Sequence, residues 1–227
     1  VAILGASGYT GVELVRLISM HPEFKIHSLS GETKSGLKFG EVYPSLQYLN
    51  LPNLCYVSDI NYDDLDLIFC ALPHTKSAAI INKLPRNIKI IDLSADFRLN
   101  TDSLYKKWYG VDHPCPDLLS KFIYGLTEFY RTDIKNSDYV ACTGCNSATG
   151  LYPIIPLVSE GIIEFDDIII NLATGVSGAG RKANEFIIHS EVSEGFSPYN
   201  VKSHRHLAEF DQELLKFSGK KIRVIFT

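Results

Sequence analysis

A glycine-rich turn at the start of the chain constrains its fold more than any other feature. Residues 1–4 (VAIL) are wholly apolar, and GASGYTG at 5–11 separates them from a stretch with apolar residues at helical spacing. Glycines in such a turn permit a tight exit from the strand, close approach of a pyrophosphate, and close packing of helix on strand. The phosphates then lie at the helix N-terminus. The turn predicts a dinucleotide site with contacts from Gly5, Ser7, Gly8, Tyr9, Thr10 and Gly11.

Short apolar runs alternate with helical segments beyond this turn. The pattern predicts a helix at 77–83 and strands at 25–30, 55–57, 67–71, 88–93 and 139–142. Such alternation is typical of right-handed βαβ units on a parallel sheet. The aromatic-rich stretch 102–131 is expected to pack irregularly. We therefore predict an α/β fold with a Rossmann-type dinucleotide-binding domain over residues 1–144.

The pattern changes after Gly161. A longer strand at 167–174, a glycine-rich loop, a helix at 207–217 and an apolar run at 221–226 predict an α+β catalytic domain over residues 145–227. The chain starts without Met and stops inside a strand-like run. We therefore expect both ends to be trimmed and the second domain to be truncated at its C-terminus.

Charge and cysteine usage exclude several classes of protein. The 227 residues include 22 basic and 26 acidic side chains, a poor basis for nucleic-acid binding. No apolar run approaches the roughly 18 residues of a membrane span. Five cysteines at low density indicate a reducing compartment rather than a disulfide frame. The sequence predicts a cytoplasmic protein with no metal site.

The residues after the second predicted strand bear on the choice of cofactor. An acid at this position favours NAD, whereas basic or small hydroxyl residues favour NADP. Glu32 supports the first, and Ser30, Thr33 and Lys34 support the second. We expect NADP(H), with contacts from Ser30 and Thr33.

Cys145 is the candidate nucleophile, because it follows Gly144 where a strand passes into a helix. A helix N-terminus stabilises a thiolate, and a thiolate beside a nicotinamide can carry an acyl group as a thioester. The alternative is a small buried residue at a turn. A cysteine nucleophile needs a base, and His204 and His206 precede the helix at 207–217. Their alternative role is to form an exposed, polar helix start.

Seven stretches in order along the chain resemble the N-acetyl-gamma-glutamyl-phosphate reductase family of the semialdehyde dehydrogenase superfamily. They are GASGYTGVELVRL (5–17), ALPH (71–74), DLSADFRL (92–99), YGLTE (124–128), TGCNSATGLYP (143–153), GVSGAGR (175–181) and HRHLAEF (204–210). The chain departs from the family pattern at four positions. The family usually has proline at or near three of these positions, which are Thr143, Thr127 and Ala208 here. At the fourth, Asn146 replaces a tyrosine beside the nucleophile.

The resemblance implies NADPH-dependent reduction of an acyl phosphate to an aldehyde through a thioester on Cys145, as in arginine biosynthesis. His206 would be the base, and His204 would orient or bind the substrate. Ser177 and Gly178 would line the site and contact the cofactor. Arg181, Arg98 and Glu128 are the substrate candidates, although each of them also suits a structural ion pair. The resemblance further implies a homo-oligomer, either a dimer or a tetramer.

Two other readings stay open on the sequence. One is a related acyl-phosphate reductase, either of the carrier-linked lysine type or aspartate-semialdehyde dehydrogenase. The other is a nucleotide-sensing regulator without catalysis, for which Asn146 is the only hint.

Overall fold

The computed structural model describes residues 1–227 and contains two compact units. The first unit comprises residues 1–97 and 113–142, and the second comprises residues 98–112 and 143–227. The segment 98–112 therefore belongs to the second unit although it interrupts the first in sequence. The excursion begins inside the buried run 94–99, so no exposed linker marks its start.

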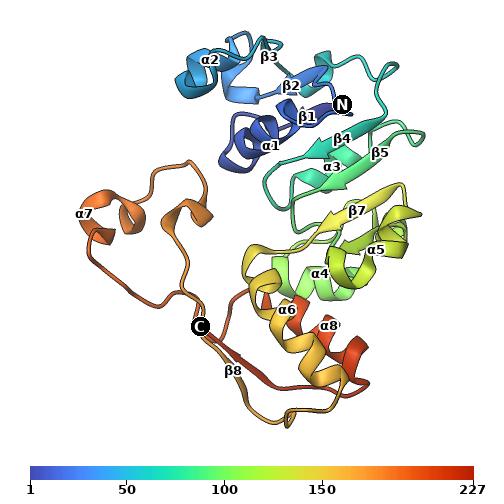
Figure 1. The fold of residues 1–227 in the computed structure, drawn as a ribbon, viewed down its shortest axis with the longest axis vertical. Helices are drawn as coiled ribbons and strands as arrows, with labels where there is room; N and C mark the ends of the chain where they lie inside the picture. The colour runs from blue at the N-terminus through green and yellow to red at the C-terminus, as the bar shows by residue number, and fades with distance from the viewer. The chain divides into compact units, whose positions relative to one another are not determined.

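A seven-stranded parallel sheet organises the first unit, with the order β3-β2-β1-β4-β5-β7-β6 (Figure 1). Each pairing is parallel, and Ala2 lies opposite both Ser28 and Ile68. The parallel sheet confirms the predicted α/β class. The strands are β1 (Ala2–Leu4), β2 (Ser28–Ser30), β3 (Leu54–Cys55), β4 (Leu67–Cys70), β5 (Lys89–Asp92), β6 (Ile123–Gly125) and β7 (Tyr139–Cys142).

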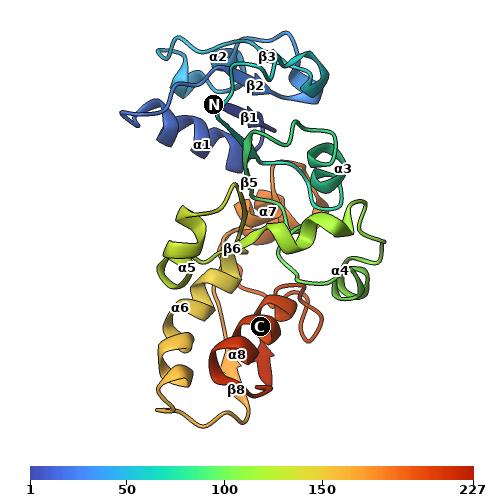
Figure 2. The same cartoon turned by 90° about the vertical axis from the view of Figure 1, so that its right-hand side faces the viewer.

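Helices cover both faces of this sheet. Helices α1 (Tyr9–Ser19) and α5 (Thr127–Lys135) lie on one face, and α3 (Ser77–Ile81) lies on the other (Figure 2). The strand order runs outward in both directions from β1, so right-handed crossovers place helices on opposite faces. The remaining elements are short: α2 (Phe39–Val42), η1 (Glu32–Lys34), η2 (Pro44–Leu46), η3 (Val57–Asp59) and η4 (Pro116–Lys121).

Two hydrophobic cores follow from the alternation of side chains along the strands. Leu4 and Ile68 pack into the core that includes Ala78 and Ile81 of α3. Ile3 and its neighbours on the opposite face pack into a second core with the buried residues of α1. Because side chains alternate between faces in a strand, one apolar run supplies both cores. This double burial positions the end of β1, where the glycine turn begins.

The expectation that residues 102–131 pack irregularly was wrong. The stretch contains α4 (Asp102–Tyr109), η4, β6 and the start of α5. The Thr101 hydroxyl accepts the N–H of Leu104 at 3.3 Å, and Gly110 ends the helix in the left-handed conformation with φ 75°. A capping Thr and a terminal Gly are ordinary helix signals. The density of aromatic residues between them obscured the pattern.

The second unit is built on α6 (Cys145–Ser159) and α8 (Leu207–Ser218), which pack side by side (Figures 1 and 2). A two-stranded parallel sheet joins β8 (Ile168–Ile170) to β9 (Val224–Phe226). Phe210 of α8 contacts Phe226, with ring centroids 5.4 Å apart. The segment between β8 and α8 holds η5 (Val176–Ala179), η6 (Glu185–Ile187) and α7 (His189–Val192). None of the helices is long and apolar enough to cross a bilayer.

Asp92 is a buried carboxyl group at the end of β5. Its oxygens accept hydrogen bonds from the Ser77 hydroxyl at 2.7 Å and from the Ser94 hydroxyl and N–H at 2.6 and 3.1 Å. Burial nevertheless raises the pKa of Asp92 from 3.8 to about 6, because these donors compensate only in part for the lost hydration. A carboxyl group with a raised folded-state pKa favours folding when protonated, and this contribution is lost as the pH rises through about 6.

We therefore expect the Asp92→Asn variant to gain stability relative to wild type as the pH rises. The difference in free energy of unfolding should shift by about 2 kcal/mol toward the variant between pH 4.5 and 7.5. Urea unfolding at the two pH values measures this shift. Asp138→Asn is the control, since Asp138 is exposed in its ion pair with Lys89. A difference that is constant with pH would show that Asp92 does not titrate in this range.

Candidate active site

The glycine turn has a backbone that only glycine can adopt at its first position. Gly5 has φ 79°, and a Cβ there would lie 2.3 Å from the carbonyl oxygen of Ala71. A Cβ at Gly11 would lie 2.3 Å from the carbonyl oxygen of Gly5, so helix α1 can approach the strand closely only with glycine here. Ser30 fixes the turn from β2, because its hydroxyl accepts the Gly5 N–H at 3.1 Å and its carbonyl accepts the Ala6 N–H at 2.8 Å.

The start of α1 fits an anionic group. Gly8 is the N-cap residue, no side chain caps the helix, and the first turn carries no acidic residue. Tyr9 and Thr10 are exposed there, and the Ser7 carbonyl accepts the Tyr43 hydroxyl at 2.8 Å. Uncapped N–H groups and the helix dipole favour a phosphate at such an end. The residues present therefore fit the pyrophosphate of a dinucleotide.

The residues that bear on the choice of cofactor lie at the end of β2 and on η1. Ser30 is buried, and its hydroxyl is committed to the turn rather than open to a ligand. The carboxylate of Glu32 accepts the N–H of Val57 at 3.1 Å, which ties this acid to the loop after β3. Thr33 and Lys34 are exposed on the same short helix. A hydroxyl and a cation are thus presented to solvent beside an acid that already has a partner.

In the second unit, Cys145 is the first residue of α6, and Gly144 is its N-cap. The thiol is exposed, and no acidic residue occupies the first turn. The structure therefore places this sulfur at a helix N-terminus, as the sequence predicted.

Gly144 allows the catalytic base candidate to approach the nucleophile. A Cβ at Gly144 would lie 2.6 Å from Nε2 of His206 and 2.8 Å from Oε1 of Glu209. The imidazole of His206 thus packs against the residue that precedes Cys145. Any larger residue at this position would displace the imidazole, the carboxylate or both.

Glu209 is a buried acidic residue beside these groups that the sequence did not single out. It is 1% exposed, its Oε2 accepts the Gly144 N–H at 2.9 Å, and its Oε1 lies 3.9 Å from Nε2 of His206. Residues three apart share a helix face, so the spacing from His206 was a usable signal. The carboxylate can orient the imidazole and stabilise its protonated form.

Arg98 contacts the same carboxylate. Its guanidinium is 5% exposed, and Nη1 lies 3.4 Å from Oε1 of Glu209. Gln212 of α8 holds the neighbouring backbone, because its Nε2 donates to the Arg98 carbonyl at 3.1 Å and its Oε1 accepts the Asn100 N–H at 2.9 Å. This geometry favours a structural role for Arg98 over direct substrate binding.

His204 lies beside His206, with ring centroids 4.5 Å apart. The backbone N–H of His206 donates to Nδ1 of His204 at 3.1 Å, so the ring proton of neutral His204 is on Nε2. Burial, and next the cation of Arg205, lowers the pKa of His204. In neutral His204 the His206 N–H occupies Nδ1, and Nε2 already carries the ring proton. Neither nitrogen is open to a further proton, so the geometry favours His206 as the base.

The remaining predicted site residues belong to other segments of the chain. Ser177 and Gly178 are in the exposed turn η5, where the Gly178 N–H already donates to the Gly175 carbonyl at 3.1 Å. The Gly178 N–H is therefore already occupied within the turn. Arg181 is exposed just beyond η5, and Glu128 is exposed in the first turn of α5 in the first unit.

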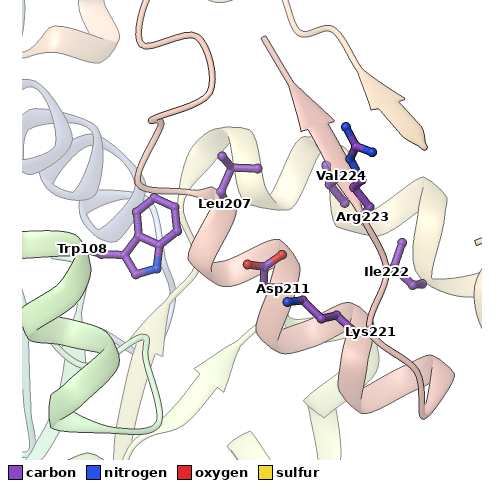
Figure 3. Close-up of a pocket in the computed structure, with 7 residues that line it drawn as sticks. All are labelled: Trp108, Leu207, Asp211, Lys221, Ile222, Arg223 and Val224. Atoms are coloured by element: carbon purple, nitrogen blue, oxygen red, sulfur yellow. The ribbon is translucent and has the colours of Figure 1, made fainter. Parts of the chain in front are cut away.

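A pocket in the second unit contains none of the candidate catalytic residues. It has a volume of about 370 Å³ and lies beside the start of α8 and β9. Figure 3 shows Asp211 and Lys221 on one side and Trp108 on the other. Burial raises the pKa of Asp211, and the cations of Lys221 and Lys107 oppose that change. The lining is Trp108, Leu207, Asp211, Lys221, Ile222, Arg223 and Val224.

Comparison with known proteins matches two family models to successive parts of the chain. The family model described as semialdehyde dehydrogenase, NAD binding domain, matches residues 1–137. That for the semialdehyde dehydrogenase dimerisation domain matches residues 145–227. N-acetyl-gamma-glutamyl-phosphate reductase from Cereibacter sphaeroides (strain ATCC 17025 / ATH 2.4.3) is 53% identical over the whole chain, which covers 67% of that relative. This chain belongs to the N-acetyl-gamma-glutamyl-phosphate reductase family.

Two further comparisons concern the family and the fold. The protein of the same name from Paracoccus denitrificans (strain Pd 1222) is 49% identical over the whole chain, which covers 66% of it. The crystal structure of aspartate semialdehyde dehydrogenase II from Vibrio cholerae has a TM-score of 0.64 at 14% identity. All of this chain and 68% of that one are matched. This second likeness shows a shared fold.

Proposed function

We propose that the protein reduces N-acetyl-glutamyl 5-phosphate to N-acetyl-glutamate 5-semialdehyde and phosphate, with NADPH as reductant, in arginine biosynthesis. The observation that carries the proposal is the exposed Cys145 at the start of α6, with His206 packed against the preceding residue. Relatives named N-acetyl-gamma-glutamyl-phosphate reductase, which are about 50% identical to this chain, supply the substrate class.

The residues of the second unit account for the acyl transfer. His206 takes the proton of the Cys145 thiol, and Glu209 stabilises the imidazolium that results. The sulfur attacks the acyl carbon, the bond from this carbon to the phosphate oxygen breaks, and inorganic phosphate leaves with the bonding electrons. The product of this step is a thioester on Cys145. His204 orients the site, and Arg181 is the candidate cation for the substrate carboxylate or phosphate.

The residues of the first unit account for the cofactor. Gly5, Ser7, Gly8, Tyr9, Thr10 and Gly11 form the cradle for the pyrophosphate. When bound, the nicotinamide supplies the hydride that reduces the thioester to the aldehyde. Thr33 and Lys34 suit the additional phosphate of NADPH, because both are exposed and the competing acid Glu32 is held by Val57.

We also propose that the protein works as a homodimer or tetramer in the cytoplasm. The C-terminal match to a dimerisation domain supports an oligomer. Large apolar side chains are also exposed in the second unit, with Phe186 and Phe196 at 83% and 86%. Five free cysteines are consistent with a reducing compartment.

A steady-state assay in the aldehyde-oxidising direction tests the function. With N-acetyl-glutamate semialdehyde, dinucleotide reduction should require inorganic phosphate, since phosphate must release the acyl group from Cys145. We expect kcat/KM to exceed that for aspartate semialdehyde by at least about 100-fold. NADP⁺ should be preferred to NAD⁺ by about 10-fold or more, because one added charged contact is worth that ratio. Activity without phosphate, or a preference for aspartate semialdehyde, would refute the assignment.

A further inference from the structure

Asn146 contacts the sulfur of Cys145 and a tyrosine from a distant part of the second unit. Its Oδ1 lies 3.8 Å from Sγ of Cys145, and its Nδ2 donates to the Tyr199 hydroxyl at 3.1 Å. Asn146 is only 8% exposed, so its carboxamide has few alternatives to these partners. Asn146 is also one of the four positions at which the chain departs from the family pattern.

The chain of hydrogen bonds continues to the two histidines. The Tyr199 oxygen lies 3.3 Å from Nε2 of His204. Because the His206 N–H occupies Nδ1 of His204, the proton on Nε2 is donated to Tyr199. The Tyr199 oxygen thus accepts two hydrogen bonds, from Asn146 and from His204. Its own hydrogen has no acceptor among these groups.

When the thiol loses its proton, the sulfur changes from a hydrogen-bond donor to an acceptor. A thiol donates to Oδ1 of Asn146, but a thiolate facing that oxygen meets an acceptor and a partial negative charge. A half-turn of the carboxamide exchanges Oδ1 and Nδ2 at nearly unchanged shape. Nδ2 then donates to the thiolate, and Oδ1 accepts the Tyr199 hydrogen that previously had no acceptor in this group. Each hydrogen bond in the chain then runs in the same direction. His206 donates to His204, His204 to Tyr199, Tyr199 to Asn146, and Asn146 to the sulfur.

We propose that Asn146 stabilises the Cys145 thiolate by this half-turn, and that Tyr199 is the positioning residue that holds the rotated carboxamide. The proposal deepens the proposed function, on which it rests in taking Cys145 as the nucleophile. The thiol proton passes to His206, so no further reactant is needed. The other charged groups near the start of α6 are Glu209 of α8 and its partner Arg98, and every variant below retains them.

The test is the pH dependence of Cys145 alkylation by iodoacetamide, followed by mass spectrometry of the peptide that contains it. Asn146→Ala should raise the midpoint pH by about one unit, since a hydrogen bond to an ionised group is worth that much. Tyr199→Phe should raise it by about half as much. The double variant should match Asn146→Ala alone, because Tyr199 acts only through Asn146. Thr149→Ala is the matched control, since the exposed Thr149 hydroxyl donates to the carbonyl, not the thiol, of Cys145.

The outcomes separate this inference from the proposed function. If Asn146→Ala leaves the midpoint where wild type and Thr149→Ala have it, the carboxamide does not stabilise the thiolate. Additive shifts in the double variant would show that Tyr199 does not act through Asn146. Either result overturns the inference and does not contradict the proposed function. A wild-type Cys145 that is alkylated no faster than an ordinary cysteine, in a protein without turnover, would instead refute the proposed function. Far-UV circular dichroism confirms that each variant is folded.

Discussion

Replacing Cys145 with alanine should abolish reductase turnover and leave NADP(H) binding unchanged. The sulfur is the only acyl carrier in the proposed reaction, so kcat should fall by at least about 10⁴-fold. The proposed cofactor site is the glycine turn and the start of α1 in the first unit, which share no residue with α6. Steady-state rates measure the loss, and fluorescence titration with NADPH measures the dissociation constant.

Cys142→Ala provides the matched control for this substitution. Cys142 ends β7, three residues before Cys145, and is half-buried in the first unit. The same loss of a sulfur atom here should leave turnover within a few-fold of wild type. If Cys145→Ala also weakens NADPH binding, the two units do not divide the roles as proposed. Residual turnover in Cys145→Ala near the wild-type rate would exclude the thioester route.

The parallel sheet could be predicted from the sequence because its signals are local. A short apolar run and a glycine turn before a helix each occupy fewer than a dozen residues. The computed structure confirms the strands and the helix that this pattern predicted around Gly5. The excursion over 98–112 could not be predicted in the same way. Its attachment depends on Gln212 and Glu209, which bind residues 98–100 from more than 100 positions away.

The residues of the candidate site likewise divide into those with a local sequence signal and those that only the structure brings together. Cys145 and His206 could be proposed because their residue types and positions at helix starts carry chemical meaning on their own. Glu209 offered a weaker local signal, its spacing of three from His206. Tyr199 offered none, since a tyrosine in a polar loop becomes significant only once its hydroxyl is seen beside Asn146 and His204. Asn146 was noticed as a departure from a family pattern, but its use required the geometry.

Glu209 has three partners, so we expect its loss to lower both the stability of the fold and the turnover rate. Its carboxylate neutralises the buried Arg98, accepts the N–H that precedes the nucleophile, and faces the imidazole of His206. Removing one member of a buried ion pair leaves the other charge in a poorly solvated position. The cost of such a change is about 3–5 kcal/mol, whereas replacing both members by neutral groups of similar size is often close to neutral.

Glu209→Ala should therefore lower the free energy of unfolding by about 3–5 kcal/mol, measured by urea unfolding as a lower midpoint at unchanged slope. Glu209→Gln combined with Arg98→Met removes both charges but retains an oxygen for the Gly144 N–H, so most of this stability should return. Turnover should not return with it, because an amide cannot stabilise the protonated form of His206. If the double variant recovers both stability and turnover, Glu209 serves only to neutralise Arg98. If it recovers neither, the carboxylate stabilises the fold through contacts other than this ion pair.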